Sequence, residues 1–323
     1  MTAQTSTETL LEAARGGDEI AFRELVAPHL RALHLHSYRM LGSYHDAEEA
    51  LQETLLRAWQ GLARYETRAP LRHWLYRITT TTCLKMINRR ARDPITNTLD
   101  AAWLQPYPDV LLDRLGDADA DPAAIVDRRE TVALAFIAAM QLLPGTQRAV
   151  LILREVLGWP AQQVADLLDT SVAAVNSALQ RARATTAQAQ GAPAPPRAGS
   201  ERERRVVAEF VRAWHDRDLP ALAALLRDDA ILTMPPQAIE IAGRDAVVEF
   251  FATVPAGGRL DLIRLVEIRA NGLPAVAAYL PGEQGDCRGY GIMVLALDGD
   301  RIAAITGFPD AGLFPVFGLP LAR

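Results

Sequence analysis

A ten-residue spacer, GAPAPPRAGS at residues 191–200, divides the chain into two parts with different hydrophobic patterns. Its three prolines and two glycines exclude a helix or a strand across it. Before the spacer, apolar residues recur at helical spacing, whereas after it short alternating stretches typical of β-strands follow helices. The length of 323 residues fits two or three domains. We therefore expect a helical part followed by an α+β part.

The composition excludes several classes of protein. With 50% hydrophobic and 23% charged residues, the chain has the balance of a folded globular protein. It has no apolar run long enough for a membrane helix, and its first residues lead us to expect no secretory signal. Its two cysteines, Cys83 and Cys287, lie far apart and lack metal-ligand spacing. We expect a cytoplasmic protein with no metal, no cofactor and no membrane contact.

Charge is distributed unevenly along the chain, whose formal net charge is −5. Residues 21–92 hold twelve Arg or Lys against six Asp or Glu, although Lys85 is the only lysine and arginine is abundant throughout. Residues 109–127 hold six Asp against Arg114 alone, with prolines nearby, which predicts an exposed acidic linker. Any nucleic-acid contact must therefore come from local patches rather than from the whole surface.

Two amphipathic helices are predicted in the first part of the chain. In DAEEALQETLLRAWQGL, residues 46–62, apolar residues fall on one face and acidic residues cluster on the other, with Asp46 placed to cap the helix. In LRHWLYRITTTTCLKMINRRAR, residues 71–92, Leu71, Leu75 and Ile78 face inward, and arginines gather at the end. Asp93-Pro94 ends this second helix.

A helix-turn-helix is predicted between residues 161 and 187. A short helix over residues 161–168 is followed by the turn Asp169-Thr170-Ser171 and by a helix over residues 172–187, with Ser171 as its N-cap. The second helix has an apolar face and an opposite polar face with amide and arginine side chains. These are the types that read base edges or hold phosphates in the DNA major groove.

The segment after the spacer predicts two helices, a strand closed by Pro235-Pro236, a further helix, and then several strands. These strands are expected at residues 260–270, 274–280, 287–297 and 301–308, with Asp298-Gly299 as a hairpin turn. The result is an α+β domain with a curved antiparallel sheet. The apolar end GLFPVFGLP, with Phe314 and Phe317, is expected to pack on the other domains or to cover a strand edge of its own domain.

These segments resemble a known family. SYRMLGSYHDAEEALQETLLRAW and PLRHWLYRITTTTCLKMINRR are similar to region 2 of the extracytoplasmic-function (ECF) sigma factors of the sigma-70 family. LPGTQRAVLILREVLGWPAQQVADLLDTSVAAVNSALQRAR resembles region 4, and FVRAWHDRDLPALAALLRDDAILTMPP resembles the SnoaL-like (NTF2-like) domain that some ECF factors carry. The order of the segments is similar to the actinobacterial sigma-G-type branch.

The resemblance implies a multidomain fold: a region 2 helical bundle, a region 4 helix-turn-helix, and a C-terminal α+β cone of the NTF2-like or SnoaL-like type. We place the parts as follows: region 2 at residues 20–93, an acidic linker at 94–129, region 4 at 130–187, a Pro/Ala-rich linker at 188–201, and the SnoaL-like domain at 202–323.

The resemblance also implies the function and the residues that carry it. The chain is expected to be a sigma factor, not an enzyme, whose partners are core RNA polymerase and promoter DNA. Region 2 would bind core polymerase through Asp46, Glu49, Gln52 and Glu53. It would recognise and melt the promoter −10 element through Arg72, Trp74, Arg77, Lys85, Asn88, Arg89 and Arg90, helped by the loop at residues 64–70. Region 4 would read the −35 element through Ser171, Asn176, Ser177, Gln180, Arg181 and Arg183.

The C-terminal domain is expected to regulate the sigma activity in cis, and a small-molecule ligand in it is left open. Two alternatives to the sigma factor are weighed. A one-component helix-turn-helix regulator with a ligand-binding domain would give residues 21–92 no role. An enzyme of the SnoaL-like class would need a catalytic His or carboxylate pair, whereas His215 is the only histidine of the tail. Its candidate carboxylates are scattered: Asp229, Glu240, Glu283 and Asp286.

Overall fold

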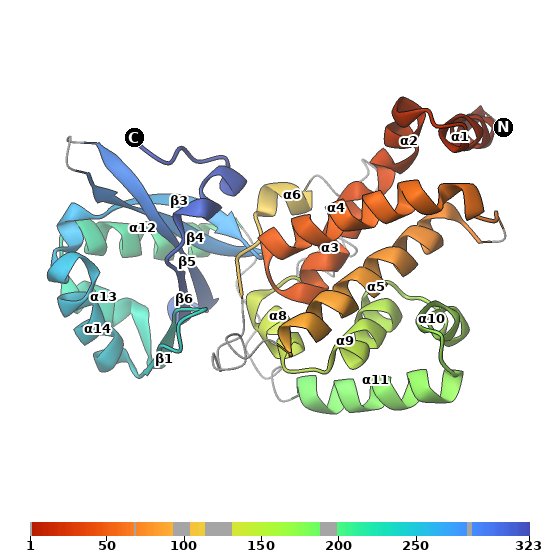
Figure 1. Ribbon diagram of the computed structural model, residues 1–323. Coiled ribbons are helices and arrows are strands. Elements are labelled where there is room, and N and C mark those ends of the chain that lie inside the picture. The colour runs from red at the N-terminus through yellow and green to blue at the C-terminus, as the bar shows by residue number, and fades with distance from the viewer. Residues whose placement is uncertain (1, 68, 93–103, 114–130, 188–198, 283–285) are drawn as a thin grey trace. The chain divides into compact units, whose positions relative to one another are not determined.

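The computed structural model divides into two compact units (Figure 1). The helical unit comprises Met1–Thr98 and Ala135–Ala189, and the sheet unit comprises Leu99–Leu134 and Gln190–Arg323. Within them the structure describes residues 2–67, 69–92, 104–113, 131–187, 199–282 and 286–323. In these ranges, none of the helices combines the length and the apolarity that crossing a bilayer requires.

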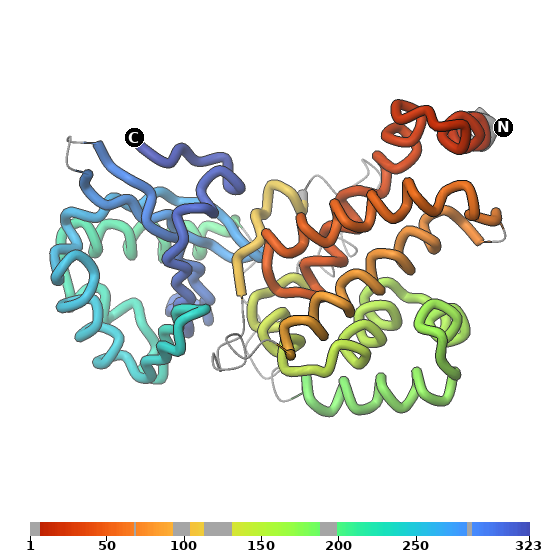
Figure 2. The backbone as a smooth tube through the Cα atoms, in the orientation of Figure 1, coloured from red at the N-terminus to blue at the C-terminus, as the bar shows by residue number. Residues whose placement is uncertain are grey.

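The helical unit contains two blocks of helices. The first block is α1 (Thr2–Arg15), α2 (Glu19–Val26), α3 (Leu30–Leu41), α4 (Tyr44–Gly61) and α5 (Leu71–Arg90), with two short 3₁₀ turns. The second block is α8 (Leu134–Gln141), α9 (Gly145–Leu151), the π-helical turn η4 (Ile152–Val156), α10 (Ala161–Leu168) and α11 (Val172–Ala187). The tube in Figure 2 shows α3, α4 and α5 side by side, with α9 against α5 and α11 against α9, and the pairwise contacts of these helices agree.

The two helices predicted in the first block form, but the cap of α4 differs from the prediction. Ser43, not Asp46, is the N-cap, because its hydroxyl accepts a hydrogen bond from the Asp46 N–H at 3.2 Å. Asp46 lies in the first turn instead, where its carboxylate pairs with Arg90. Of the predicted apolar face of α4, Ala47 and Ala58 are fully covered, whereas Leu51 and Leu55 are half-buried because the buried face is centred nearer to Ala50.

The sheet unit is a six-stranded sheet with the strand order β2-β1-β6-β5-β4-β3. Its helices are α6 (Asp109–Asp113), α12 (Glu201–His215), α13 (Leu219–Leu225) and α14 (Arg244–Thr253). Its strands are β1 (Leu226–Thr233), β2 (Glu240–Ala242), β3 (Arg264–Ala270), β4 (Leu273–Pro281), β5 (Cys287–Asp298) and β6 (Arg301–Phe308).

The prediction of an antiparallel sheet is wrong at one pair of strands. β1 runs parallel to β6, and the other neighbouring strands are antiparallel. After β1 the chain forms the edge strand β2 and the helix α14, and it continues with β3 at the opposite edge of the sheet. The meander from β3 to β6 then brings the last strand beside β1 in the same direction. The predicted hairpin at Asp298-Gly299 is confirmed, since Asp298 pairs with Arg301.

The core of the sheet unit lies between one face of the sheet and the helices α12, α13 and α14. Phe210, Trp214 and Phe251 lie at its centre, with the Trp214 and Phe251 rings 5.1 Å apart. The C-terminal segment covers part of the sheet unit: Phe314 packs against Tyr279 with ring centroids 4.9 Å apart, and Ala322 forms an antiparallel bridge with Arg288. The apolar end of the chain thus packs within its own unit.

The expectation of an exposed acidic linker is wrong for its described start. Asp109 is only 4% exposed, and Tyr107 only 2%, because both contact the turn between β3 and β4 in the sheet unit. Buried hydrogen bonds satisfy the Asp109 carboxylate, as a buried charge requires. The other acidic residues of this stretch that the sequence singles out, from residue 117 to residue 127, lie outside the described residues.

Two buried histidines of α3 make the helical unit sensitive to acid. Burial lowers the pKa of His34 to about 4, and burial together with the nearby Arg39 charge lowers the pKa of His36 to about 3. The Nε2 atom of His36 lies 2.9 Å from the Thr80 hydroxyl of α5. Because both rings stay neutral in the folded state well below pH 6.5, protonation in that range favours the unfolded chain.

We predict that the free energy of unfolding of the helical unit falls as the pH drops from 7 to 5. The unfolded chain takes up protons near pH 6.5 that the folded rings do not, at a cost of about 2 kcal/mol for each histidine at pH 5. Urea denaturation of the wild type and of His36→Gln at both pH values checks this. His36→Gln should lose a clear part of the pH-dependent change, with the rest due to His34 and to His29 and His73, whose pKa values burial also lowers. An unchanged pH dependence in that variant would contradict the assignment.

Candidate nucleic-acid interface

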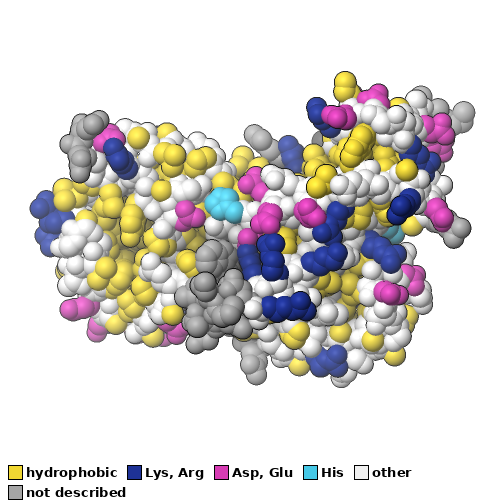
Figure 3. Space-filling view, in the orientation of Figure 1, with side chains coloured by type: hydrophobic (Ala, Val, Ile, Leu, Met, Phe, Trp, Pro, Cys, Tyr) yellow, Lys and Arg dark blue, Asp and Glu magenta, His cyan; other side chains and the backbone are white. Residues whose placement is uncertain are grey.

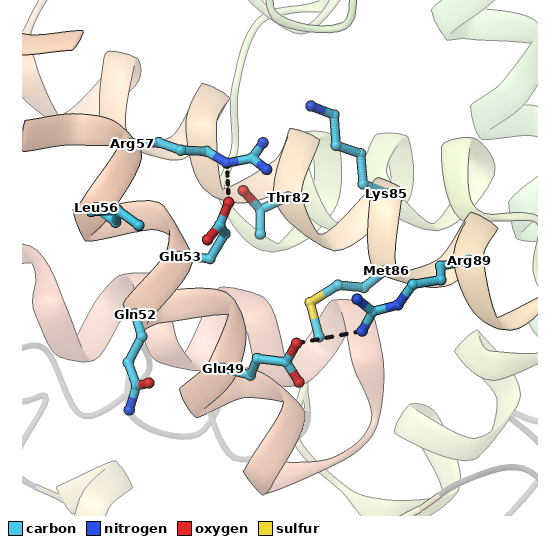
Figure 4. Close-up of a pocket in the computed structure, with 9 residues that line it drawn as sticks. All are labelled: Glu49, Gln52, Glu53, Leu56, Arg57, Thr82, Lys85, Met86 and Arg89. Atoms are coloured by element: carbon cyan, nitrogen blue, oxygen red, sulfur yellow. Dashed lines mark hydrogen bonds and ion pairs between the residues drawn. The ribbon is translucent and has the colours of Figure 1, made fainter. Parts of the chain in front are cut away.

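A hollow of about 490 Å³ lies between α4 and α5 (Figure 4). It is lined from α4 by Glu49, Gln52, Glu53, Leu56 and Arg57, and from α5 by Thr82, Lys85, Met86 and Arg89. Carboxylates and basic groups therefore share one surface, and Figure 3 shows Lys and Arg beside Asp and Glu on this part of the molecule. Leu56 and Met86 add apolar atoms to the lining.

The structure brings three of the four predicted polymerase-binding residues to this hollow. Glu49 pairs with Arg89 at 3.4 Å and Glu53 pairs with Arg57 at 2.5 Å, while Gln52 is exposed. Asp46 lies one turn earlier on α4, with only 14% of its side chain exposed, in an ion pair with Arg90. The acidic face of α4 and the basic end of α5 thus contact each other directly.

The seven residues predicted for the −10 element do not form one surface. Lys85 and Arg89 line the first hollow, Asn88 is exposed, and Arg90 is held by Asp46. At the other end of α5, the exposed Arg72 lies over the Tyr76 ring, with its guanidinium carbon 5.8 Å from the ring centroid.

Trp74 and Arg77 line a second hollow of about 410 Å³, together with Arg57, Gly61, Arg64, Ile78 and Thr81. The half-buried Trp74 ring lies 4.9 Å from the Tyr65 ring at a tilt of 33°, so that two aromatic side chains stack beside the hollow. Arg64 and Arg77 are exposed at its rim. An aromatic wall beside guanidinium groups suits a nucleotide base and its phosphate.

The helix-turn-helix exposes all six residues predicted for the −35 element. The Ser171 hydroxyl accepts the Ala174 N–H at 3.1 Å and caps α11, as predicted. The polar face of α11 is exposed, whereas Val175, Ala178, Leu179 and Ala182 are buried. Arg183 also makes a contact within the protein: its Nε donates to Glu155 at 2.5 Å, which joins α11 to the π-helical turn η4. The other five predicted side chains are Ser171, Asn176, Ser177, Gln180 and Arg181.

The second block of helices packs against the first through α5. Trp159 contacts His73 and Tyr76, with ring centroids 4.4 Å and 5.4 Å apart. Gly145, at the start of α9, lies so close to α5 that an added Cβ would be 3.1 Å from Leu84. One side of α5 is therefore covered, and its exposed side is the one that lines the two hollows.

A buried arginine holds the two blocks together. Arg148 of α9 is 5% exposed, and its guanidinium donates to the Met40 carbonyl at the end of α3 and to the Gln141 side chain. It also donates to the carbonyls of Gln141 and Leu143, at 3.0 Å and 3.1 Å. Burial lowers the pKa of Arg148 to about 10. The carbonyl oxygens at the ends of α3 and α8 thus receive donors that their own helices lack.

Leu56 and Arg57 line these hollows without belonging to the predicted site residues, and Arg64 enters the prediction only as part of the loop at residues 64–70. Leu56 is a large aliphatic side chain with 52% exposure, while Arg57 and Arg64 line the second hollow. Leu56 follows Gln52 by one helical turn, so the helical period could have found it. The family resemblance points to the loop that begins at Arg64, but the place of Arg64 beside Trp74 depends on how this loop folds after α4.

The sheet unit offers no grouping of catalytic type among the described residues. His215 accepts a hydrogen bond from the Leu265 N–H, Asp229 pairs with Arg227, and Asp286 pairs with Arg288. Glu240 is exposed on β2, and Glu283 lies outside the described residues. Apolar side chains fill the space between sheet and helices, which gives no support to a small-molecule site there. Across the described ranges, no three His, Cys, Asp or Glu side chains are placed to hold a metal ion.

Three parts of the chain match known families. Residues 25–93 match the family described as Sigma-70 region 2, residues 133–185 match Sigma-70, region 4, and residues 207–305 match the SnoaL-like domain. The first matched segment contains the helices α3 to α5, and the second contains α8 to α10 and most of α11. The third contains most of the sheet unit.

The chain is also similar to individual proteins. It is 40% identical over 330 residues to the ECF RNA polymerase sigma factor SigG of Mycobacterium tuberculosis, covering 95% of this chain and 85% of that protein. It is 30% identical over 242 residues to SigJ of the same organism, covering 72% of each. The crystal structure of the M. tuberculosis ECF sigma factor SigJ matches 94% of this chain and all of that chain, with a TM-score of 0.63 and 22% identity. This structural match shows a shared fold.

We predict that Arg148→Met lowers the free energy of unfolding of the helical unit by about 3 kcal/mol. The variant keeps a long side chain but leaves buried carbonyl oxygens without donors. Urea denaturation followed by circular dichroism measures the change, with the exposed Arg23→Met as the matched control. Equal stability of the two variants would show that the Arg148 hydrogen bonds do not hold the blocks together.

Proposed function

Because this chain belongs to the ECF RNA polymerase sigma factors of the sigma-70 family, we propose that each block of its helical unit performs one part of promoter recognition. The first block, region 2, binds core polymerase through α4 and the −10 element through α5. The second block, region 4, reads the −35 element through α11. The observation that carries this proposal is the exposed polar face of α11 after a tight turn, in the same unit as the mixed-charge surface of α4 and α5.

The α4 side of the first hollow suits a partner surface with basic and apolar groups. Glu49 and Glu53 supply negative charge, Gln52 supplies an amide, and Leu56 supplies an exposed aliphatic side chain between them. A central apolar contact within a charged rim is the usual composition of a specific protein interface. We assign this surface to core polymerase. Docking there requires Glu49 and Glu53 to exchange their present arginine partners for groups of the polymerase.

The second hollow is assigned to the −10 element. Melting a duplex requires a place for an unpaired base and cations that hold its phosphates. Trp74 supplies a stacking surface beside the hollow, and Arg57, Arg64 and Arg77 supply positive charge around it. Lys85, Asn88 and Arg89, further along the exposed side of α5, would hold the strand as it continues.

The exposed face of α11 is assigned to the −35 element. Asn176 and Gln180 carry amides that can bond two groups of an adenine, and Arg181 can bond a guanine. Ser177 lies between them on the helix, and Ser171 places its side chain at the helix N-terminus, where a DNA phosphate would be favoured. Arg183 binds DNA after its ion pair with Glu155 breaks, or it keeps that ion pair and stabilises the position of α11.

The C-terminal domain is proposed to regulate these activities in cis, in the cytoplasm where RNA polymerase acts, without catalysis of its own. The absence of catalysis is supported by the positions of His215, Asp229 and Asp286, which are paired or lie on the surface. The alternative of a one-component regulator finds no support, because it leaves region 2 without a role. Residues 25–93 match that region as a whole.

We predict that the double variant Glu49→Gln, Glu53→Gln weakens binding to core RNA polymerase at least tenfold at low salt. Both changes keep the side-chain size and remove charge from the proposed interface, so the loss should shrink as salt screens the remaining charges. A binding titration of full-length protein with core polymerase measures the change.

The matched control is Glu48→Gln, which removes an exposed charge from the same helix but does not line the hollow. Asp46 is left unchanged in this test because its ion pair with Arg90 also joins α4 to α5. If the double variant bound as tightly as the control, this surface would not be the polymerase interface.

We predict that Gln180→Ala, Arg181→Ala removes most promoter-specific transcription while core binding is kept. Each lost base contact costs about 1–3 kcal/mol, so the two together should reduce initiation at least tenfold. In vitro transcription with core polymerase and a promoter library measures this, with Thr185→Ala on the same helix as the control.

The same experiment tests the function as a whole. Promoter-specific transcripts that require the wild-type chain support the sigma assignment, and their loss in the α11 variant supports the −35 assignment. Equal transcription by the α11 variant and the Thr185 control would move −35 recognition away from Gln180 and Arg181. If the wild-type chain neither bound core polymerase nor produced transcripts, the sigma assignment would be wrong.

A further inference from the structure

Tyr65 holds the chain between α4 and α5 in place beside the second hollow. Its ring stacks on Trp74 with centroids 4.9 Å apart, and its hydroxyl donates to the Ala69 carbonyl at 2.6 Å. Its backbone N–H donates to the Leu62 carbonyl at 3.1 Å, at the end of the 3₁₀ turn η2 (Leu62–Arg64). Tyr65 is buried and does not line the hollow itself. It supports the Trp74 ring, which does.

A further contact of Tyr65 comes from a helix that precedes the residues matched to region 2. The guanidinium of Arg15, in the last turn of α1, donates from Nη2 to the Tyr65 carbonyl. The match to region 2 covers residues 25–93, so the other partners of Tyr65 lie inside it and Arg15 lies outside it. The helix α1 therefore contacts the loop that follows α4 directly.

The position of Arg15 is set by the packing of α1 on α2. Leu11 and Ala14, three residues apart on one side of α1, are both buried. The turn after α1 contains Gly17 with a φ of 95°, and the Asp18 N–H donates back to a carbonyl of α1 at 3.1 Å. Asp18 then caps α2. α1 thus presents Arg15 from an end that is fixed by contacts of its own.

The two attachments of Tyr65 outside its own turn act together on its ring. The ring can leave Trp74 if the side chain rotates or if the backbone of Tyr65 moves. The hydroxyl bond to Ala69 opposes the rotation, and the bond from Arg15 to the carbonyl opposes the backbone movement. A guanidinium bond to a carbonyl is charge-assisted and therefore stronger than a bond between neutral groups.

A shift of Tyr65 would change the shape of the second hollow. Trp74 and Gly61 both line this hollow, and they lie so close that a Cβ added at Gly61 would be 3.4 Å from ring carbon Cζ2 of Trp74. The Trp74 ring thus has a close neighbour in α4 as well as its stacking partner in the loop. Loss of that partner would let the ring move within the space proposed for an unpaired base.

We propose that Arg15 is a positioning residue for −10 recognition, which keeps Tyr65, and through it Trp74, in the place that an unpaired base requires. This role rests on the proposed function, because a base must enter the second hollow for it to matter. Arg15 lines neither hollow and contacts no DNA in this role. Its loss should therefore weaken base capture and leave binding to core polymerase intact.

The test uses three full-length variants. Arg15→Met removes the donor and keeps a long side chain, and Arg15→Lys restores a charged donor. Arg23→Met is the matched control, because Arg23 is exposed on the neighbouring helix α2. All three should bind core polymerase within twofold of the wild type, which shows that region 2 stays folded. Weaker core binding by Arg15→Met alone would mean that Arg15 supports region 2 as a whole, and this would overturn the proposed role.

The readout is the contribution of single bases to binding by each holoenzyme. The probe is the non-template strand of the −10 element from a promoter selected by transcription of the library, intact or with one base at a time replaced by an abasic site. Removing the captured base should weaken binding by the wild type at least tenfold. Arg15→Met should bind the intact strand at least fivefold more weakly and lose most of the penalty at this position. Arg15→Lys and Arg23→Met should keep it.

Trp74→Leu, which keeps an apolar side chain and removes the aromatic ring, separates this role from the proposed function. If Trp74→Leu abolishes the penalty at one position and Arg15→Met leaves it unchanged, Arg15 does not position the site. Equal weakening by Arg15→Met on the intact strand and on every abasic strand would also overturn the role. If Trp74→Leu changes no penalty, no base stacks in the second hollow, and the −10 assignment of that hollow is wrong together with the role of Arg15.

Discussion

The arrangement of the helical unit depends on the need of buried carbonyl oxygens for donors. The last carbonyls of a helix have no partner within it, and at the ends of α3 and α8 the guanidinium of Arg148 supplies the donors. This single side chain places α9 against region 2. The packing of Trp159 on His73 and Tyr76 then follows, and with it the side of α5 that remains exposed. The exposed side of α5, to which we assign DNA binding, is therefore defined in part by a contact between helices in the interior of the unit.

The same surfaces show that charge alone does not identify a partner. Glu49 and Arg89 belong to sets that the sequence assigns to different macromolecules, yet they pair with each other across one hollow. Exposed pairs of this kind contribute little to stability, so they can exchange partners at a small cost. The ion pair between Asp46 and Arg90 is less exposed and therefore contributes more to the stability of the free protein. A charged residue on α4 or α5 can thus stabilise the free protein and bind a partner in the complex.

Most of the local structure could be predicted from the sequence, because it depends on neighbouring residues. The strand over residues 301–308 and the cap at Ser171 are where the pattern predicts them. The errors have a common physical origin. Ser43 competes with Asp46 for the cap of α4, β2 is a strand of three residues and is too short to have a period, and the parallel pairing of β1 with β6 joins segments about 70 residues apart. Long-range pairing of this kind has no local signal.

The sequence by itself determined the order of the parts, their helical or mixed character, and the polar face of α11, since periodicity and turn residues act over a few positions. Only the tertiary structure decided which side chains meet. The Asn-Gly pair at residues 271–272 signals a turn, but nothing near it in the sequence indicates that its amide binds Tyr107 and Val132. Nor does the acidic character of residues 109–127 reveal that Asp109 is buried on Arg269. Such contacts arise because folding brings distant backbone groups out of water together, where each must find a partner.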